Sequence, residues 1–124
     1  MGKKADNSFY DGALNVLKNG MVRMAACSAE PANYAGIAAV RLAEATVASG
    51  DFTVANGDTS GRKVTVAAKS GVAISSSGTA NHVVLHDNAA ILGYATTCTN
   101  LVLTSGGGNT VNFPSWKIEI LAPT

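Results

Sequence analysis

Short apolar segments separated by turn residues constrain the fold of this chain more than any other feature. Between Thr79 and Ile120, segments such as His82 to His86, Val111 to Phe113 and Trp116 to Ile120 are rich in β-branched and aromatic residues. Asp-Asn, glycine-rich or proline-containing stretches end each of them within a few residues. Short strands with frequent turns are typical of sandwiches, barrels and jelly rolls.

The residues upstream extend the same pattern. Met21 to Cys27 and Phe52 to Ala55 read as strands, and Arg62 to Ala68 alternates so that Val64 and Val66 share one buried face. Arg41 to Val47 lies in an alanine-rich region that would also suit a helix, and its β-type neighbours favour a strand. With roughly eight or nine short strands, the sequence predicts an all-β, mainly antiparallel, jelly-roll-like sandwich or barrel.

Two local signals refine this prediction. Asn56-Gly57 follows a predicted strand, and Asn-Gly favours a type I′ hairpin turn, in which both central residues have positive φ. The Ser75 to Gly78 and Ser105 to Asn109 tracts are too short for domain linkers and predict hairpin tips.

The amino-terminal region has a different period. Phe9, Ala13, Val16 and Leu17 recur at helical spacing and predict a short amphipathic helix over Ser8 to Lys18. Gly12 inside it costs about 1 kcal/mol of helix stability relative to alanine, so packing of the apolar stripe must hold the helix. We therefore divide the chain into an arm and helix, residues 1–20, and a β-module, residues 21–124.

Composition and charge limit the classes of partner. Apolar residues make up 47% of the chain and charged residues 14%, and the apolar fraction is mainly alanine and valine. Such a thin core favours association with a partner, and we expect a homo-oligomer. A net charge of +1 gives no field that would attract nucleic acid or an anionic membrane, and neither partner is expected. No window approaches the ~20 apolar residues of a membrane span, and no apolar stretch follows the first lysines as in a secretory signal.

The residues that could carry chemistry are scattered. His82 and His86 lie four apart on a predicted strand, roughly 13 Å, which is too far for one metal ion to bridge. We expect two partly exposed histidines and no metal site. Glu30, Glu44 and Glu119 give no acid/base pair by spacing. The sequence therefore predicts a protein that is not an enzyme and needs no cofactor.

The cysteines and the single tryptophan leave alternatives open. Cys27 and Cys98 fit no metal or secreted disulfide pattern, so we expect small buried side chains, and a disulfide between neighbouring strands stays an alternative. Trp116 could stack on a sugar, although a solitary tryptophan is more often a core or interface anchor.

Three segments resemble a family of small virion proteins of tailed bacteriophages. They are Asp51 to Val66, Gly78 to Asp87, which follows the pattern G-T-A-x-H-V-x-L-x-D, and Gly108 to Ile118, which contains G-N-T-V-x-F-P. The resemblance covers roughly residues 41–124 and carries no catalytic residue.

The resemblance implies a decoration or cement protein. Such a protein is made in the host cytoplasm and binds the major capsid protein on the outside of the head, as a dimer or trimer with a jelly-roll-like fold. We expect the arm and helix to contact a neighbouring copy or the capsid. The candidate contact residues are Lys3, Lys4, Phe9, Tyr10, Leu14 and Trp116.

Two other functions remain open at this stage. One is a component of the tail or fibre of the virion, which the sequence scarcely separates from a head protein. The other is a carbohydrate-binding β-sandwich that uses Tyr94 and Trp116.

Overall fold

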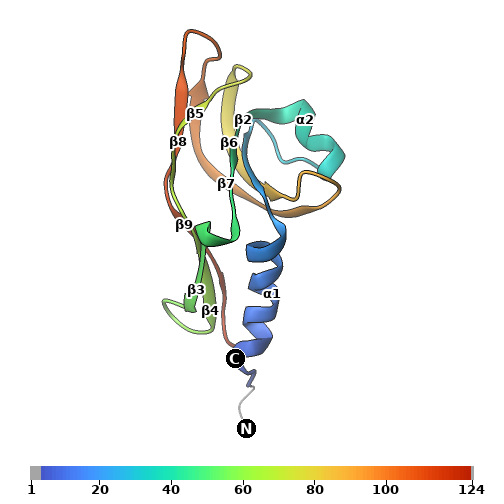
Figure 1. Ribbon diagram of the computed structural model, residues 1–124, viewed down its shortest axis with the longest axis vertical. Coiled ribbons are helices and arrows are strands. Elements are labelled where there is room, and N and C mark those ends of the chain that lie inside the picture. Colours follow the sequence, from blue (N-terminus) through green and yellow to red (C-terminus); the bar gives the residue numbers. More distant parts are fainter. Residues whose placement is uncertain (1–3, 124) are drawn as a thin grey trace.

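The chain folds into antiparallel β-sheets with one long amino-terminal helix (Figure 1). The computed structural model describes residues 4–123. The helices are α1 (Asn7–Gly20) and the short α2 (Ile37–Val40), with single 3₁₀ turns η1 (Tyr34–Gly36) and η2 (Ser49–Asp51). The strands are β1 (Arg23–Cys27), β2 (Arg41–Thr46), β3 (Phe52–Asn56), β4 (Arg62–Val66), β5 (Lys69–Ala73), β6 (Gly78–His86), β7 (Leu92–Leu103), β8 (Thr110–Phe113) and β9 (Trp116–Ile120). The predicted all-β, mainly antiparallel class is confirmed.

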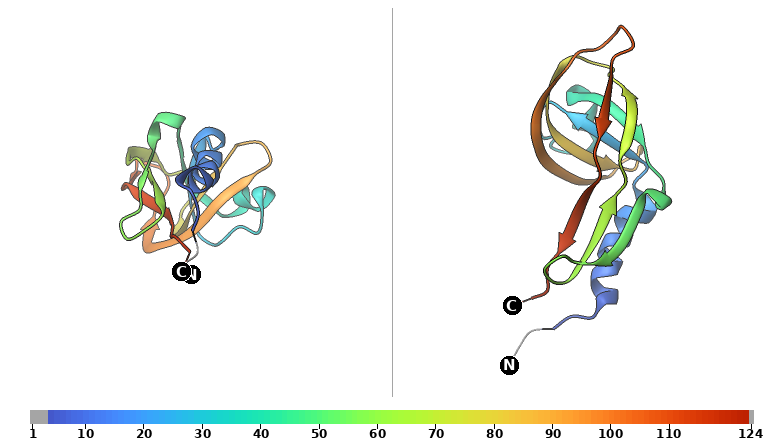
Figure 2. Two further views of the ribbon diagram at one scale, coloured as in Figure 1. Left: turned by 90° about the horizontal axis from the view of Figure 1, so that it is seen from below. Right: turned by 90° about the vertical axis from the view of Figure 1, so that its left-hand side faces the viewer.

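The strands form three sheets that do not join into a closed barrel. Their orders are β2-β1-β6-β7, β3-β4-β9 and β5-β8. β7 and β8 follow one another in the chain but pair with different strands, β7 with β6 and β8 with β5. The upper half of the molecule is therefore a curved but open β-structure (Figure 2).

Two of these sheets continue one another as a long ribbon. Val66 pairs with Trp116 in the β4–β9 ladder, and Lys69 pairs with Phe113 in the β5–β8 ladder. From Val66 to Lys69 is three residues, and from Trp116 back to Phe113 is also three. The two ladders therefore keep the same register across Pro114. The ribbon runs along much of the long axis of the molecule (Figure 2).

The main core lies between the sheets, and β1 is buried on both of its faces. Met24 and Ala26 point into the main core, whereas Ala25 and Cys27 pack with Ile37 of α2 in a smaller cluster. Alternate positions of a strand point to opposite faces, so this burial explains why β1 carries no charged residue after Arg23. Val64 and Val66 are fully buried, as the alternation in β4 predicts.

Helix α1 packs beside β3 and β4 at the lower end of the molecule (Figure 1). It begins after Asp6, whose carboxylate accepts a hydrogen bond from the Ser8 N–H at 2.9 Å. Leu14 and Leu17 belong to the same core as the strands. The helix and the β-module thus share one core.

The packing face of α1 differs from the predicted one. Its buried residues are Tyr10, Leu14 and Leu17, whereas Phe9, Ala13 and Val16 of the predicted stripe are exposed. Both stripes are apolar, so periodicity could not decide between them. The ion pair of Asp11 with Arg62 and the bonds of Lys18 to the carbonyls of Ser49 and Phe52 fix the orientation.

The hairpin predicted at Asn56-Gly57 is confirmed, because β3 and β4 pair antiparallel, but its turn is not the type I′ turn that we expected. Neither residue has a positive φ, and the loop closes four residues later, where the Gly57 N–H donates to the Gly61 carbonyl at 3.0 Å. Gly61 adopts φ +65°, and a Cβ there would lie 1.8 Å from the Ile120 carbonyl oxygen. Gly57 also needs its glycine, because a Cβ there would lie 2.0 Å from the Ser60 carbonyl oxygen, and the close approach of β9 adds the same requirement at Gly61.

The described helices include none with the length and apolarity needed to cross a membrane.

Candidate functional site

The outer face of α1 is the first candidate contact surface. Phe9 is 74% exposed and Val16 is 63% exposed. The structure thus places Phe9 where a partner could reach it. Tyr10 and Leu14, which we expected at the same surface, are buried inside this chain instead, because they lie on the stripe that faces β3 and β4.

The charged side chains of α1 are turned away from this face. Arg62 Nε donates to Asp11 Oδ1 at 2.8 Å, and Arg62 Nη2 donates to Asp11 Oδ2 at 3.3 Å. Lys18 Nζ donates to the carbonyls of Ser49 at 2.9 Å and Phe52 at 2.8 Å. The exposed face of the helix therefore keeps only apolar and small neutral residues, which is unusual for a helix facing water.

The end of β7 is the second candidate contact surface. Leu101 is 52% exposed and Val102 is 73% exposed, close to the connection between β7 and β8. The whole of β7 is free of charged residues and proline. This surface lies at the end of the molecule opposite the amino terminus of α1 (Figure 1).

A cleft of about 320 Å³ opens beside it, between β7 and β8. Its walls are mainly apolar, and a second cleft of about 300 Å³ continues along the same gap toward β9. The apolar lining residues of the first cleft include Val83, Leu101, Leu103, Val111, Phe113 and Pro114. The gap follows directly from β7 and β8 pairing with different strands.

Trp116 forms part of the wall of the second cleft and is anchored from inside. Its indole N–H donates to the Met24 sulfur at 3.3 Å, and its ring centroid lies 6.0 Å from that of Tyr94. Both rings are partly buried against the main core. Trp116 is thus a core residue with one accessible side.

Of the two amino-terminal lysines, Lys4 is exposed and Lys3 lies outside the described residues.

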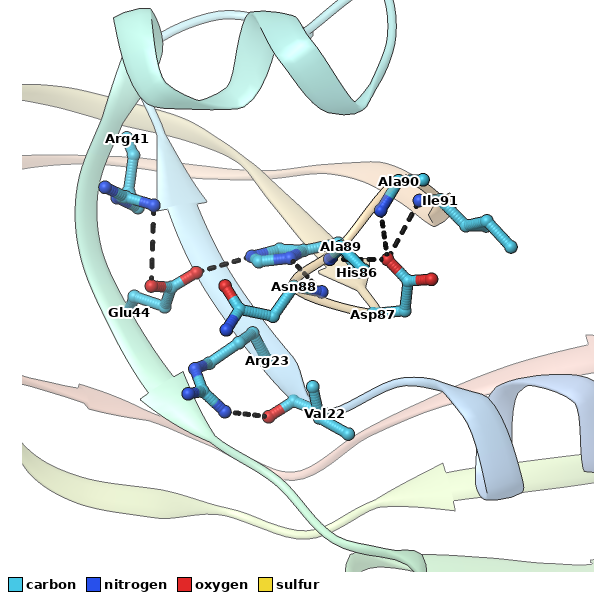
Figure 3. A network of polar contacts seen from close by, with 10 residues as sticks. All are labelled: Val22, Arg23, Arg41, Glu44, His86, Asp87, Asn88, Ala89, Ala90 and Ile91. Atoms are coloured by element: carbon cyan, nitrogen blue, oxygen red, sulfur yellow. Dashed lines mark hydrogen bonds and ion pairs between the residues drawn. The ribbon is translucent and has the colours of Figure 1, made fainter.

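A polar network around His86 was not predicted from the sequence (Figure 3). His86 is only 1% exposed, which corrects the expectation of a partly exposed side chain, whereas His82 is half-buried. The Nε2 atom of His86 faces Glu44 Oε1 in a short hydrogen bond, and Glu44 Oε2 lies 3.5 Å from Arg41 Nη1. The ring of Tyr34 packs edge-on against the imidazole at 5.5 Å.

The same imidazole holds the turn that follows β6. The Asn88 N–H donates to His86 Nδ1 at 3.0 Å, and Asp87 Oδ1 accepts from the N–H groups of the next three residues, Ala89, Ala90 and Ile91. Four consecutive backbone donors are thus satisfied by two side chains (Figure 3). These bonds lower the pKa of Asp87, because they favour the ionised carboxylate.

The chemistry of this network is that of a structural site. Because Nδ1 accepts a hydrogen bond from a backbone N–H, the neutral ring carries its proton on Nε2 and donates it to Glu44. Neither ring nitrogen is left to act on a substrate. The network joins β2, β6 and the turn, and no pattern in the sequence links Glu44 with His86.

Both cysteines are free thiols. Burial raises the pKa of Cys27 to about 11 and also raises that of Cys98. Only the thiolate is a strong nucleophile, so neither side chain is activated for covalent chemistry. Within residues 4–123, no group of three or more histidine, cysteine or acidic side chains is arranged to hold a metal ion.

Comparison of the chain with protein-family models, with curated proteins and with solved structures found no match.

Proposed function

We propose that this protein is a non-enzymatic structural component of a bacteriophage virion that binds the outside of the capsid lattice and stabilises it. The jelly-roll-like arrangement expected from the family resemblance, the major capsid protein as partner and the location on the virion belong to the same proposal. The resemblance of three segments to small tailed-phage virion proteins is its starting point.

The observation that carries the proposal is the position of the unpartnered apolar surface. Four of the six large exposed apolar side chains among residues 4–123 lie in two pairs, on α1 (Phe9 and Val16) and at the end of β7 (Leu101 and Val102), at opposite ends of an elongated molecule. The other two, Ile91 and Leu121, lie singly. Exposed apolar side chains grouped in this way mark interaction sites. Two such surfaces suit a protein that contacts the lattice with one end and a neighbour with the other.

The end of β7 is the surface we assign to the lattice. It combines Leu101 and Val102 with an adjoining apolar cleft, and a long uncharged strand gives it backbone donors and acceptors for pairing. A surface of this kind adds interface area between subunits without any reaction.

Co-sedimentation with phage heads assembled without this protein tests the proposal. We expect saturable binding, and electron micrographs of the decorated heads should show density repeating with the lattice. Val102→Glu should weaken binding at least about tenfold, because it places a charge in an apolar contact. Ile91→Glu is the matched control, since Ile91 is also an exposed apolar residue but lies in the turn after β6. Absence of binding to heads would refute the capsid role. An equal loss of head affinity in Val102→Glu and Ile91→Glu would refute it as well.

The neighbouring rings of Tyr94 and Trp116 keep carbohydrate binding as a second candidate. Aromatic rings stack on sugars, but here both rings pack on the core and the indole N–H is already bonded to Met24. Binding of immobilised glycans that is lost in Tyr94→Ala, without loss of the fold, would favour this candidate over the capsid.

A further inference from the structure

Helix α1 carries a second apolar face that its own chain leaves uncovered. Phe9, Ala13 and Val16 are exposed, and Gly12 lies between them on the same side of the helix. With 100° between successive residues, this face is distinct from the one formed by Tyr10, Leu14 and Leu17. An apolar helix face that its own chain leaves uncovered is a candidate contact surface for a partner.

The charges of the helix indicate which kind of partner fits this face. Asp11 and Lys18 are held by Arg62 and by two backbone carbonyls of the same chain, so neither seeks a partner across the outer face. A charged or strongly polar partner would lose its solvation there without gaining a counter-charge. An identical uncharged face has no such cost.

We propose that the outer face of α1 pairs with the same face of a second copy of this chain, as two antiparallel helices related by a two-fold axis between Gly12 and Ala13. The spacing of the residues is self-complementary about that axis. Phe9 precedes Gly12 by three residues and Val16 follows Ala13 by three. Phe9 of one copy therefore meets Val16 of the other, and the two smallest side chains meet at the axis.

Gly12 supports the same arrangement. A Cβ at Gly12 would meet nothing within 4 Å, and its φ is not positive, so neither packing nor backbone geometry within the chain requires a glycine. Glycine also weakens a helix relative to alanine. Close approach of a second helix would explain the glycine, because the distance between two packed helices depends on the size of the side chains where they cross.

The size of the contact sets the strength we expect. A helix of 14 residues is about 21 Å long, so a contact made by one pair of such helices is small for a protein–protein interface. The isolated protein should associate weakly, with a dimer fraction that rises with concentration. This inference does not depend on the capsid proposal, although a dimer would give a lattice-binding protein two attachment points.

Sedimentation equilibrium of the full chain over a range of concentrations tests the proposal. We expect a monomer–dimer equilibrium, and Val16→Glu should raise the dimer dissociation constant at least about tenfold by placing a charge against Phe9 of the second copy. Val102→Glu makes the same change at another exposed valine, at the other end of the molecule, and is the matched control that should leave dimerisation unchanged.

A double variant tests the register of the helix pair. Phe9→Lys combined with Val16→Glu should recover most of the affinity that Val16→Glu loses. Only an antiparallel pair with the proposed axis places the introduced ammonium group of one copy opposite the introduced carboxylate of the other. No recovery in the double variant would overturn this register.

Gly12→Leu separates a specific helix pair from general apolar adhesion. The larger side chain has open space within its own chain, so the fold should persist, and its bulk should weaken the proposed pair. Stronger association of Gly12→Leu would overturn the proposal. So would a monomer at every concentration, a trimer, or equal effects of Val16→Glu and Val102→Glu. If the protein is a monomer and still binds heads, only the proposed helix pair is refuted. If it is a dimer and does not bind heads, only the proposed capsid function is refuted.

Discussion

His86 is the buried polar residue at which β2, β6 and the turn after β6 are joined. Its ring donates to Glu44 and accepts from the Asn88 N–H. Both bonds need the same tautomer of the imidazole, so each bond favours the other. Spacing along one strand relates His86 only to His82. The true partner of His86 is 42 positions away on another strand, and a sequence without its sheet register contains no signal for that pair.

We predict that His86→Ala lowers the free energy of unfolding by about 3 kcal/mol, because it removes a buried ring and leaves Glu44 Oε1 and the Asn88 N–H without the hydrogen bonds that the ring makes. His82→Ala, on the same strand but half-buried, should cost less than about 1 kcal/mol. Urea denaturation followed by tryptophan fluorescence measures both. Equal losses would mean that the Glu44–His86 contact does not stabilise the fold.

Asp58 makes acid sensitivity predictable at one exposed site. Hydrogen bonds from Lys117 and Lys63 lower its pKa from the ordinary value of 3.8 to about 2. A carboxyl whose pKa is lower in the folded chain contributes stability above pH 3.8, and this contribution disappears as the pH falls toward 2. The urea midpoint of the wild type should therefore fall in this window, and Asp58→Asn should reduce the fall.

Glu30→Gln serves as the control for this pH series, because Glu30 is an exposed carboxylate in the loop after β1. It should leave the wild-type profile unchanged. An Asp58→Asn profile that coincides with that of the wild type between about pH 2 and pH 4 would contradict the role given to the two lysines.

At the scale of elements, most strands could be placed from the sequence because each carries its own pattern and ends at its own turn signal. The orientation of α1 could not, since Phe9, Ala13 and Val16 form as good a stripe as Tyr10, Leu14 and Leu17. In the structure the stripe with the two leucines is the buried one, and contacts of Asp11 and Lys18 with distant segments accompany this orientation. The type of the turn after β3 was predicted wrongly for a similar reason. The approach of Ile120 to Gly61 is a contact between distant segments, and the local sequence does not contain it.

Gly61 and Gly107 form a matched pair for testing that contact. Both have positive φ, +65° and +61°, but a Cβ would lie 1.8 Å from the Ile120 carbonyl oxygen at Gly61 and would meet nothing within 4 Å at Gly107. We expect Gly107→Ala to cost about 1 kcal/mol from backbone strain alone and Gly61→Ala to cost at least about 3 kcal/mol. Thermal and urea unfolding compare them. Similar costs would show that β9 does not constrain the loop.

At the scale of the whole molecule, the order of the strands in the sheets could not be predicted from the sequence. β1 lies between β2 and β6, and β4 pairs with β9, which follows it by about fifty residues. Such pairings depend on which strand faces can be buried together. The alternation within a strand indicates only that one of its faces is buried, and not against which other strand. For the same reason, the prediction of a jelly-roll-like sandwich or barrel gave no indication that β7 and β8 lie in different sheets with a gap between them.

The continuous ribbon of β4–β5 against β8–β9 has a mechanical consequence. Its strands run along the long axis that separates the two apolar surfaces (Figure 2). A force along this axis that slides one strand of the ribbon past the other loads many backbone hydrogen bonds at the same time. A hairpin pulled open from its tip breaks its bonds one by one. The ribbon is therefore oriented to resist stretching along the long axis of the molecule.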